Sequence, residues 1–449
     1  MTDTIFALSS GHPPAGVAVV RMSGPSVRQV LQDISVKVPK GRESVLSQII
    51  HPSTGDLLDE ALILWFEGPA SYTGEDVAEL HLHGGRAVVK AVLETLADFE
   101  GLRVAEPGEF TRRAFDAGKL DLTTVEGISD LISADTEHQR KQAIKQASGA
   151  LYGLCERWRN ELIRCRAMIE AELDFSDEED IPDSVSDVIW SDLDRLHQEF
   201  ITQIRLSSRS ERMKDGLRIV ILGRPNAGKS SLLNRLAQRD VAIVTEEAGT
   251  TRDILSVDLD LEGYPVTLMD TAGIRETSGV VEKEGIRRAY DQAMLADIVI
   301  ELIDHTVEPE ASIEHSNKLD APVWKILNKA DLGDLEATTG LSTDKQSNKT
   351  LLLSAKTGLG IDLLIDEITK FCREYWLGSE SALINRSRHQ KLLKNASMAL
   401  GRALENKNQP LEIRAEEIRF ACDEIGRISG RVDVEDLLDV IFGEFCVGK

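Results

Sequence analysis

A glycine-rich segment near the middle of the chain has the residue types and spacing needed to bind phosphate groups. Residues 223–230 read GRPNAGKS; they follow an apolar run, residues 217–222, and precede a run with helical spacing. This is the pattern G-x-x-x-x-G-K-[ST] between a strand and a helix, where backbone N–H groups and the positive end of the helix surround phosphates. We therefore expect Lys229 to neutralise the β- and γ-phosphates of a nucleotide and Ser230 to ligate Mg²⁺.

Three further motifs follow in order, each after an apolar run typical of a strand. Residues 270–273 read DTAG, which offers a carboxylate to Mg²⁺ and a glycine N–H to the γ-phosphate. Residues 328–331 read NKAD, and Asp331 can accept hydrogen bonds from N1–H and the exocyclic amine of guanine, a donor pair that adenine lacks. Residues 354–356 read SAK, where a backbone N–H can meet the guanine O6. The four motifs resemble those of translation-factor-class GTPases and predict that the nucleotide is GTP.

The group that activates the attacking water is less clearly marked. Residues 249–253 read GTTRD, and Thr251 is our choice for a switch threonine that ligates Mg²⁺ in the triphosphate state. Ras-like enzymes orient the water with a glutamine after the DxxG glycine, whereas this chain has Ile274, which cannot form a hydrogen bond. The polar segment that follows offers Glu282 and Glu284 instead. Asn226 has a side-chain carbonyl that could hold a monovalent cation beside the phosphates, or it could simply shape the loop.

The expected nucleotide site thus combines the phosphate-binding loop, the switch segment and the three later motifs. Its residues are Asn226, Ala227, Gly228, Lys229, Ser230, Ser231, Thr245, Glu246, Glu247, Ala248, Gly249, Thr250, Thr251, Asp270, Thr271, Ala272, Gly273, Asn328, Lys329, Asp331, Ser354, Ala355 and Lys356. Within this set, Ser230 and Thr251 are the expected Mg²⁺ ligands.

The segments around these motifs predict the elements that position them. Residues 1–118 mix short β-rich runs with Gly-Pro turns, which indicates a compact α+β domain. Residues 119–214 and 377–449 carry apolar residues at helical spacing, whereas residues 215–376 alternate strands and helices, as in a parallel sheet with crossover helices. We predict a multidomain α/β protein: an N-terminal α+β domain, then a discontinuous helical domain into which a Ras-like P-loop domain is inserted.

Composition limits the classes of partner and compartment. The 449 residues include 76 Asp and Glu against 52 Lys and Arg, a net charge of −24, which argues against tight non-specific nucleic-acid binding by the chain alone. It does not exclude a nucleic-acid substrate presented by a basic partner. No Cys/His cluster indicates a zinc site, and no apolar run approaches the roughly 20 residues needed to cross a bilayer. We expect a cytoplasmic protein without a membrane segment, and we expect four of its cysteines to be buried in apolar cores: Cys155, Cys165, Cys372 and Cys422.

Several separate segments together resemble the MnmE (TrmE) family of tRNA-modification GTPases, which belongs to the TRAFAC-class group TrmE-Era-EngA-YihA-Septin-like. The segments are GRPNAGKSSLLN, AGTTRD, DTAGIRE, NKAD, PGEFTRRAFDAGKLDL and the terminal FCVGK. The resemblance extends from the segment around Arg21 to Lys449. The PGEF…KLDL segment and the terminal Cys-x-Gly-Lys are specific to that family, whereas the GTPase motifs are not. Val447 stands where the family usually has Ile, which is a conservative change.

The resemblance implies a one-carbon site in the N-terminal domain. A tetrahydrofolate derivative, 5-formyltetrahydrofolate or 5,10-methylenetetrahydrofolate, would be bound by Arg21, Glu79 and Lys119, with Lys449 from the C-terminal segment. These charges suit such a ligand, since the cations can pair with its glutamate tail or formyl oxygen and Glu79 can accept from the pterin amino group. The family also places Cys446 near this pocket, where it is either functional or a small residue that fills space.

The resemblance also implies a potassium site and the identity of the catalytic residue. Potassium would be bound by Asn226, Thr245, Glu247 and Thr250, and it would take the place of an arginine finger when two GTPase domains associate. Glu282 matches the glutamate that orients the water in the family.

The partners implied by the resemblance are a second copy of the chain, GTP, tRNA and the FAD protein MnmG (GidA). The N-terminal domain would form the homodimer, and MnmG would join it in a heterotetramer or a larger complex. Together the two proteins would add an aminomethyl or carboxymethylaminomethyl group to C5 of the wobble uridine of certain tRNAs. FAD would enter only through the partner.

Two other classes of protein share parts of the pattern. A ribosome-assembly GTPase such as Era or the double-GTPase Der has the phosphate-loop asparagine and GTTRD, but such proteins usually carry a basic RNA-binding module, and this chain has a net charge of −24. A membrane-remodelling GTPase would need a basic amphipathic helix, which we do not find. The N-terminal domain and the CVGK segment favour the tRNA-modification enzyme.

Overall fold

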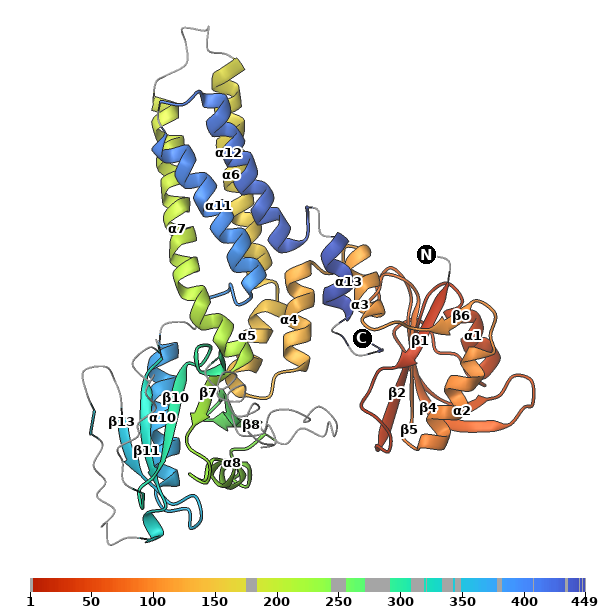
Figure 1. The fold of residues 1–449 in the computed structure, drawn as a ribbon. Coiled ribbons are helices and arrows are strands. Elements are labelled where there is room, and N and C mark those ends of the chain that lie inside the picture. The colour runs from red at the N-terminus through yellow and green to blue at the C-terminus, as the bar shows by residue number, and fades with distance from the viewer. Residues whose placement is uncertain are drawn as a thin grey trace, which may run out of the picture. The chain divides into compact units, whose positions relative to one another are not determined.

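The computed structural model describes most of the chain (Figure 1). The described residues are 3–174, 184–243, 256–270, 291–307, 319, 321–332, 342–343, 349–377, 382–406, 408–432, 435–443, 445 and 447–448. They form two compact units. One comprises Met1–Ser129, Gln146–Trp190 and Arg402–Lys449, and the other comprises Asp130–Lys145 and Ser191–Gly401. No helix in these ranges is long and apolar enough to cross a membrane.

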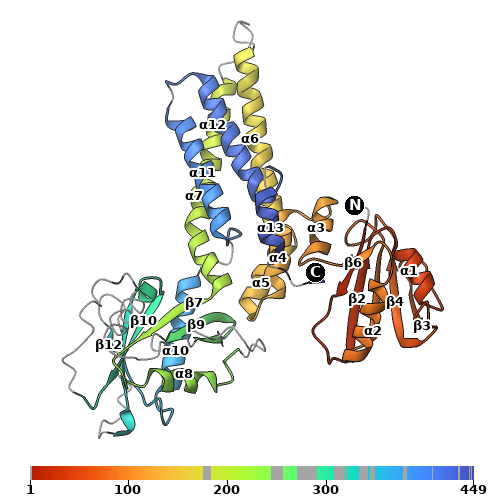
Figure 2. The ribbon, with the colours of Figure 1, turned by 45° about the vertical axis from the view of Figure 1, so that its right-hand side comes forward.

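The N-terminal domain of the first unit is a six-stranded sheet with helices on one face. Its strands lie in the order β3-β4-β5-β2-β1-β6, and all neighbours are antiparallel except β1 and β6. The bounds are β1 Thr4–Leu8, β2 Val17–Ser23, β3 Ser44–Ile50, β4 Leu57–Phe66, β5 Val77–His83 and β6 Leu102–Val104. Helices α1 (Val27–Ile34) and α2 (Arg86–Ala97) bury their apolar sides on the sheet (Figure 2).

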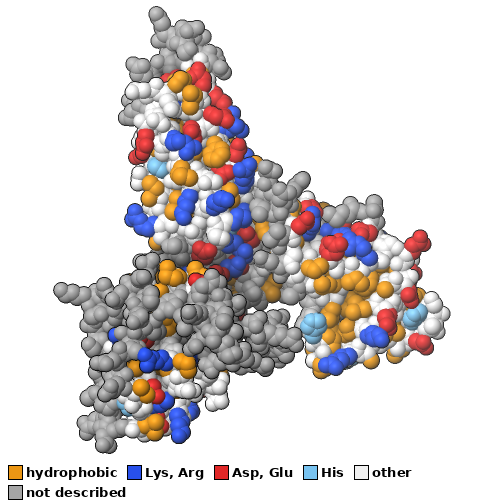
Figure 3. All heavy atoms as spheres, viewed as in Figure 1, with side chains coloured by type: hydrophobic (Ala, Val, Ile, Leu, Met, Phe, Trp, Pro, Cys, Tyr) orange, Lys and Arg blue, Asp and Glu red, His pale blue; other side chains and the backbone are white. Residues whose placement is uncertain are grey.

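The opposite face of this sheet carries Arg21 and Glu79, two of the residues that the sequence analysis predicts for the one-carbon site. Because side chains alternate along a strand, Arg21 and Glu79 point away from the helix-covered core and face one another across β2 and β5. The same face carries exposed apolar side chains, among them Leu46 and Leu62, which are cross-strand neighbours. In Figure 3 hydrophobic side chains gather on the visible surface of this domain.

The structure explains why the PGEF…KLDL segment, residues 107–122, contains a glycine and an aspartate before its helices. Gly108 (φ 68°) precedes α3 (Glu109–Asp116), and a Cβ there would lie 2.5 Å from the backbone oxygen of Phe442. Asp121 then caps α4 (Leu122–Ile132), since one carboxylate oxygen accepts from the N–H groups of Thr123 (2.9 Å) and Thr124 (3.1 Å). The glycine and the aspartate therefore set the start of each helix.

Six further helices of the described residues are distributed over the two units. They are α5 Glu137–Ala147, α6 Ala150–Asp174, α7 Ser184–Asp215, α11 Ser387–Glu405, α12 Leu411–Ser429 and α13 Glu435–Gly443. On α6, Leu151, Cys155, Trp158, Leu162 and Cys165 are all buried, as their helical spacing predicts. Cys372 and Cys422 are also buried, and burial raises the pKa of the Cys372 thiol to about 12, so the prediction that these four cysteines are core residues is confirmed.

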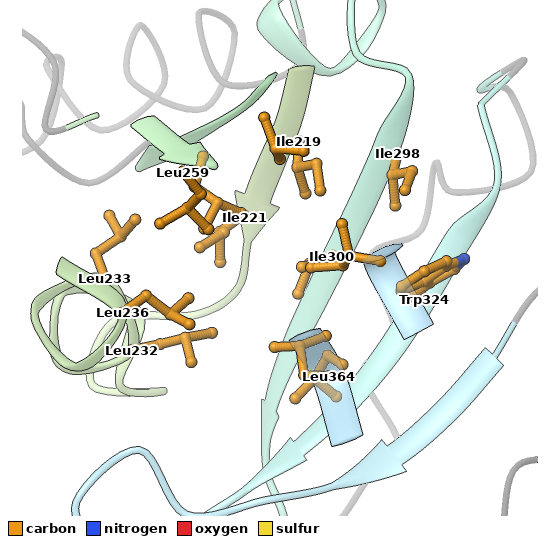
Figure 4. Close-up of a cluster of buried hydrophobic side chains, with 14 of the residues drawn as sticks. Ile219, Ile221, Leu232, Leu233, Leu236, Leu259, Ile298, Ile300, Trp324 and Leu364 are labelled. Atoms are coloured by element: carbon orange, nitrogen blue, oxygen red, sulfur yellow. The ribbon is translucent and has the colours of Figure 1, made fainter. Parts of the chain in front are cut away.

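The second unit contains the inserted α/β domain. Its sheet has the order β12-β13-β11-β10-β7-β9-β8, with a parallel centre and antiparallel edges. The bounds are β7 Leu217–Leu222, β8 Ser256–Leu261, β9 Tyr264–Asp270, β10 Ile298–Asp304, β11 Val323–Asn328, β12 Ser342–Thr343 and β13 Lys349–Leu352. Apolar side chains of α8 (Lys229–Ala237) and α10 (Ile361–Trp376) pack on the sheet, as Figure 4 shows for Leu232, Leu236 and Leu364. The predicted parallel sheet with crossover helices is confirmed.

Residues of α5 contact the tip of the β8–β9 hairpin within the second unit. The His138 ring stacks on Tyr264 with centroids 4.2 Å apart, and Tyr264 stacks in turn on Trp376 at 5.2 Å. The backbone N–H of His138 donates to the oxygen of Gly263 at 3.2 Å. Gly263 has a φ of 91°, and a Cβ there would come within 2.9 Å of the His138 ring, so the close approach requires glycine.

Candidate functional site

The phosphate-binding loop connects β7 to α8 and has little room for side chains. A Cβ at Gly223 would lie 2.5 Å from the backbone oxygen of Leu302, and one at Gly228, where φ is 100°, would collide with the Asn328 amide. Asn226 itself has a φ of 64°, a conformation that asparagine tolerates better than most residues. The glycines of the motif are thus required by the backbone path that wraps a phosphate.

The charged and hydroxyl groups of the loop lie where the sequence predicts. Lys229 is buried, and its Nζ donates to the backbone oxygens of Gly223 (2.8 Å) and Arg224 (3.1 Å), so its charge is held inside the loop. Ser230 Oγ donates to a carboxylate oxygen of Asp270 at the end of β9, at 3.0 Å. A hydroxyl and a carboxylate are the oxygen ligands that Mg²⁺ prefers, so this pair fits the ion.

The base-recognition motifs are joined to the phosphate loop through Asn328. Its Nδ2 donates to the backbone oxygen of Ala227 at 2.7 Å, and its Oδ1 accepts from the Ala355 N–H at 2.9 Å. Arg235 of α8 donates through Nε to the Ala355 oxygen at 3.2 Å and also contacts the Lys356 oxygen. The buried side chain of Asn328 and the side chain of Arg235 therefore fix the distance between the phosphate-binding loop and the SAK motif.

Asp331 is prepared to accept hydrogen bonds. Ser354 Oγ donates to Asp331 Oδ1 at 2.6 Å, and this hydrogen bond is the main reason that the pKa of Asp331 lies below its usual value. The carboxylate is therefore ionised at neutral pH and can receive the two N–H donors of guanine. Next to it, Lys329 forms an ion pair with Asp304, and His305 Nδ1 lies 2.8 Å from the Asn328 backbone oxygen.

Part of the expected nucleotide site lies outside the described residues. This part includes the switch segment, the end of the DTAG motif and the expected catalytic glutamate: Thr245, Glu246, Glu247, Ala248, Gly249, Thr250, Thr251, Thr271, Ala272, Gly273 and Glu282. Cys446 and Lys449 also lie outside the described residues. Their roles stay predictions, as does the potassium set around Asn226.

Two residues of the second expected group meet on the outward face of the N-terminal sheet, and a third lies near the loop after β4. Arg21 donates through Nε (3.0 Å) and Nη2 (2.8 Å) to the same oxygen of Glu79, and the other Glu79 oxygen lies 3.3 Å from His81 Nε2. Lys119 donates its Nζ to the backbone oxygen of Pro69, in the loop between β4 and β5. The three described residues predicted for this site, Arg21, Glu79 and Lys119, thus lie in one domain, two of them in direct contact.

Sequence reasoning missed three residues around Arg21. Tyr72 and Phe110 each place their ring centroid 5.7 Å from the Arg21 Cζ, and His81 lies beside Glu79. Strand alternation could have found His81, since it lies two residues after Glu79 on β5. Nothing in the spacing of the chain relates Tyr72 or Phe110 to Arg21.

The C-terminal segment packs on the N-terminal domain within the first unit. Phe442 of α13 lies between Phe115 and Phe445, with both centroid distances 6.2 Å. Val447 forms a β-bridge with Pro107, and Ser9 Oγ donates to the Gly448 backbone oxygen at 2.7 Å. Of the described neighbours of Cys446 and Lys449, Val447 therefore lies beside Pro107 and Gly448 lies against the end of β1.

Comparison with known proteins assigns the chain to a family. A family model described as "MnmE helical domain" matches residues 122–446, and one described as "GTP-binding protein TrmE N-terminus" matches residues 4–119. The chain belongs to the MnmE family. Relatives named "tRNA modification GTPase MnmE" include the protein of Bradyrhizobium sp. (strain ORS 278), 48% identical over 447 residues, and that of Sinorhizobium medicae, 50% identical over 448 residues. Each match covers 100% of this chain and 99% of the MnmE relative.

Two solved structures match part of this MnmE chain. A crystal structure of Aquifex aeolicus Era is 26% identical, covers 34% of this chain and 56% of its own, and has a TM-score of 0.26. The G domain of the FeoB iron transporter of T. maritima is 25% identical over 35% of this chain, with a TM-score of 0.25. The family assignment rests on the relatives that match along the whole length.

Proposed function

We propose that this protein is a GTP-hydrolysing enzyme of tRNA modification. With the FAD protein MnmG, it adds an aminomethyl or carboxymethylaminomethyl group to C5 of the wobble uridine of certain tRNAs, and a tetrahydrofolate derivative supplies the one-carbon unit. The observation that supports the proposal is that one chain holds two separate groups of polar side chains: Lys229, Ser230 and Asp331 in the α/β domain, and the Arg21–Glu79 pair on the N-terminal sheet. The relatives that match along the whole chain bear the name of such an enzyme.

In the GTPase half, the described residues bind and orient the nucleotide. Asp331 would receive guanine, Lys229 would neutralise phosphate charge, and Ser230 with Asp270 would hold Mg²⁺. When bound, Mg²⁺ neutralises charge that develops on the phosphate oxygens. Thr251 would complete the Mg²⁺ site, and Glu282 would orient the attacking water. The assignment of Thr251 rests on the GTTRD motif, and the choice of Glu282 rests on the family resemblance.

A potassium ion would complete the hydrolysis site. Asn226 lies in the loop with its backbone turned to a positive φ of 64°, and Thr245, Glu247 and Thr250 would supply the other ligands. We expect Asn226→Ala to reduce the difference between hydrolysis rates in KCl and in NaCl. We also expect Glu282→Ala to leave GTP affinity nearly intact and to cut hydrolysis. A persistent salt difference, or an unchanged rate, would remove the respective residue from the mechanism.

In the one-carbon half, the charges fit a folate ligand. Arg21 offers N–H groups to a carboxylate or formyl oxygen, Glu79 can accept from an amino group of the pterin, and Lys119 adds a second cation. Lys449 would come from the C-terminal segment, whose described residues Val447 and Gly448 lie on this domain. The exposed apolar pair Leu46 and Leu62 on the same sheet face supports a homodimer formed through this domain.

The test is calorimetric titration of the purified protein with 5-formyltetrahydrofolate, beside an Arg21→Ala control. Micromolar binding that is lost in the control would support a one-carbon site, and tRNA modification would then be the function that uses both halves. If the folded protein does not bind the folate, the one-carbon assignment fails. The alternative, a GTPase switch of the Era or Der type, would then account better for the chain.

A further inference from the structure

The Arg21 guanidinium lies close to two aromatic rings. Its Cζ is 5.7 Å from the ring centroid of Tyr72 and 5.7 Å from that of Phe110. Phe110 is fully buried, whereas Tyr72 is 37% exposed. A cation within about 6 Å of an aromatic ring is attracted by the negative face of the ring, most strongly where water is partly excluded. Both rings therefore attract the guanidinium, the buried ring of Phe110 and the partly exposed ring of Tyr72.

The Tyr72 ring is itself held in place. Its hydroxyl is 3.0 Å from Thr111 Oγ1, and Thr111 is almost completely buried on α3. The rest of the loop is fixed to the same helix, because Glu75 accepts from the buried Arg113 at 3.0 Å. The position of Tyr72 is thus set by α3, and a ring that is fixed in advance loses little conformational entropy when a ligand binds.

Arg21 retains capacity for a ligand. A guanidinium has five N–H groups, and Arg21 directs two of them to one oxygen of Glu79, which leaves three without a partner among the described residues. The remaining edge presents parallel donors, the arrangement that binds carboxylate and carbonyl oxygens. Its direction depends on the plane of the guanidinium, and the rings of Tyr72 and Phe110 constrain that plane.

We propose that Tyr72 is a positioning residue of the one-carbon site. Its ring, fixed by Thr111, acts together with the ring of Phe110 to hold the free N–H edge of Arg21 toward an anionic or carbonyl oxygen of the tetrahydrofolate ligand. This inference rests on the proposed function of the domain and adds a residue that acts through Arg21.

The experiment measures 5-formyltetrahydrofolate affinity of the full-length protein by calorimetry for three variants. Tyr72→Leu removes the ring and should weaken binding about 2- to 30-fold, the range expected for one cation–π contact. Tyr72→Phe keeps the ring and loses only the hydroxyl, so this variant should retain most of the folate affinity of the wild type. Thr111→Val removes the same hydrogen bond from its other partner. Combined with Tyr72→Phe, it should therefore weaken folate binding no further than Tyr72→Phe does alone. Affinity for a fluorescent GDP analogue, unchanged in all variants, is the folding control.

A double-mutant cycle separates positioning from a general structural effect. Arg21→Lys keeps a cation but cannot present the planar fork, so Tyr72→Leu should cost much less in that background than in the wild type. Equal losses in both backgrounds, or a Tyr72→Leu variant that binds like the wild type, would overturn the inference while the one-carbon function stands. If the wild-type protein does not bind the folate, the proposed function itself fails, and this inference fails with it.

Discussion

The contact between Gly448 and β1 provides the most specific test of how the C-terminal segment is placed. Gly448 has a φ of 100°, and a Cβ at this position would lie 2.9 Å from the carbonyl carbon of Leu8 and 3.1 Å from the Cα of Ser9. These are backbone atoms, which cannot rotate away as a flexible side chain can. We predict that Gly448→Ala releases the segment from the N-terminal domain.

The magnitude follows from the backbone strain that the substitution adds to the docked segment. An L-residue in the left-handed region costs about 1–2 kcal/mol. The hydrogen bond between Ser9 Oγ and the Gly448 oxygen, 2.7 Å long, is lost on release in the wild type and in the variant alike, so it does not enter the difference. The strain alone would shift the equilibrium between docked and released segment by about 5- to 30-fold. The collision with Leu8 adds to this, so the figure is a lower estimate.

Hydrogen exchange followed by mass spectrometry would measure the effect. Amides of residues 438–448 should lose protection in Gly448→Ala, 5-formyltetrahydrofolate should bind more weakly, and GTP hydrolysis should not change. The matched control is Gly443→Ala in the same segment, since a Cβ there meets nothing within 4 Å. Unchanged protection of the segment in Gly448→Ala would refute the steric reasoning, and a similar loss in Gly443→Ala would show that the effect is not specific to the contact with β1.

Three further predictions concern the GTPase domain. Asn328→Ala removes two buried hydrogen bonds and should weaken GDP binding at least about tenfold in a fluorescence titration, without loss of fold by circular dichroism. Ser354→Ala removes the hydrogen bond that lowers the pKa of Asp331, so GDP affinity should be lost at a higher pH than in the wild type as the solution is acidified. Gly263→Ala strains a positive φ and presses on His138, which should lower the melting temperature of the domain by roughly 2–8 °C in calorimetry.

The parts of the fold that local pattern specifies could be predicted from the sequence. The phosphate loop is one example, because its glycine spacing and the flanking strand and helix lie within about 20 residues of each other. The buried cysteines of α6 are another, since Cys155 and Cys165 share one helical stripe with Trp158. The insertion of the α/β domain between helical segments followed from the change of periodicity alone.

The contacts around the proposed one-carbon site could not be predicted in the same way. Arg21 and Glu79 are 58 positions apart in the chain. Their contact depends on the pairing register of β2 and β5, which local sequence does not reveal. That Tyr72 lies over Arg21 depends on a loop fixed by a hydrogen bond to Thr111, and such side-chain anchors leave no periodic signal. These residues were accessible only by resemblance or by structure.

The hydrogen bond between Ser9 and Gly448 joins residues 439 positions apart, which has a consequence for biosynthesis. At about 5–20 residues per second, a ribosome adds Gly448 about 20–90 s after Ser9. The strands of the N-terminal sheet all lie within the first 104 residues, so that sheet can form early in translation. The contact with the C-terminal segment forms last, after the whole nucleotide-binding domain has been synthesised. Chains interrupted after Val104 but before Gly448 would therefore carry the sheet without this contact.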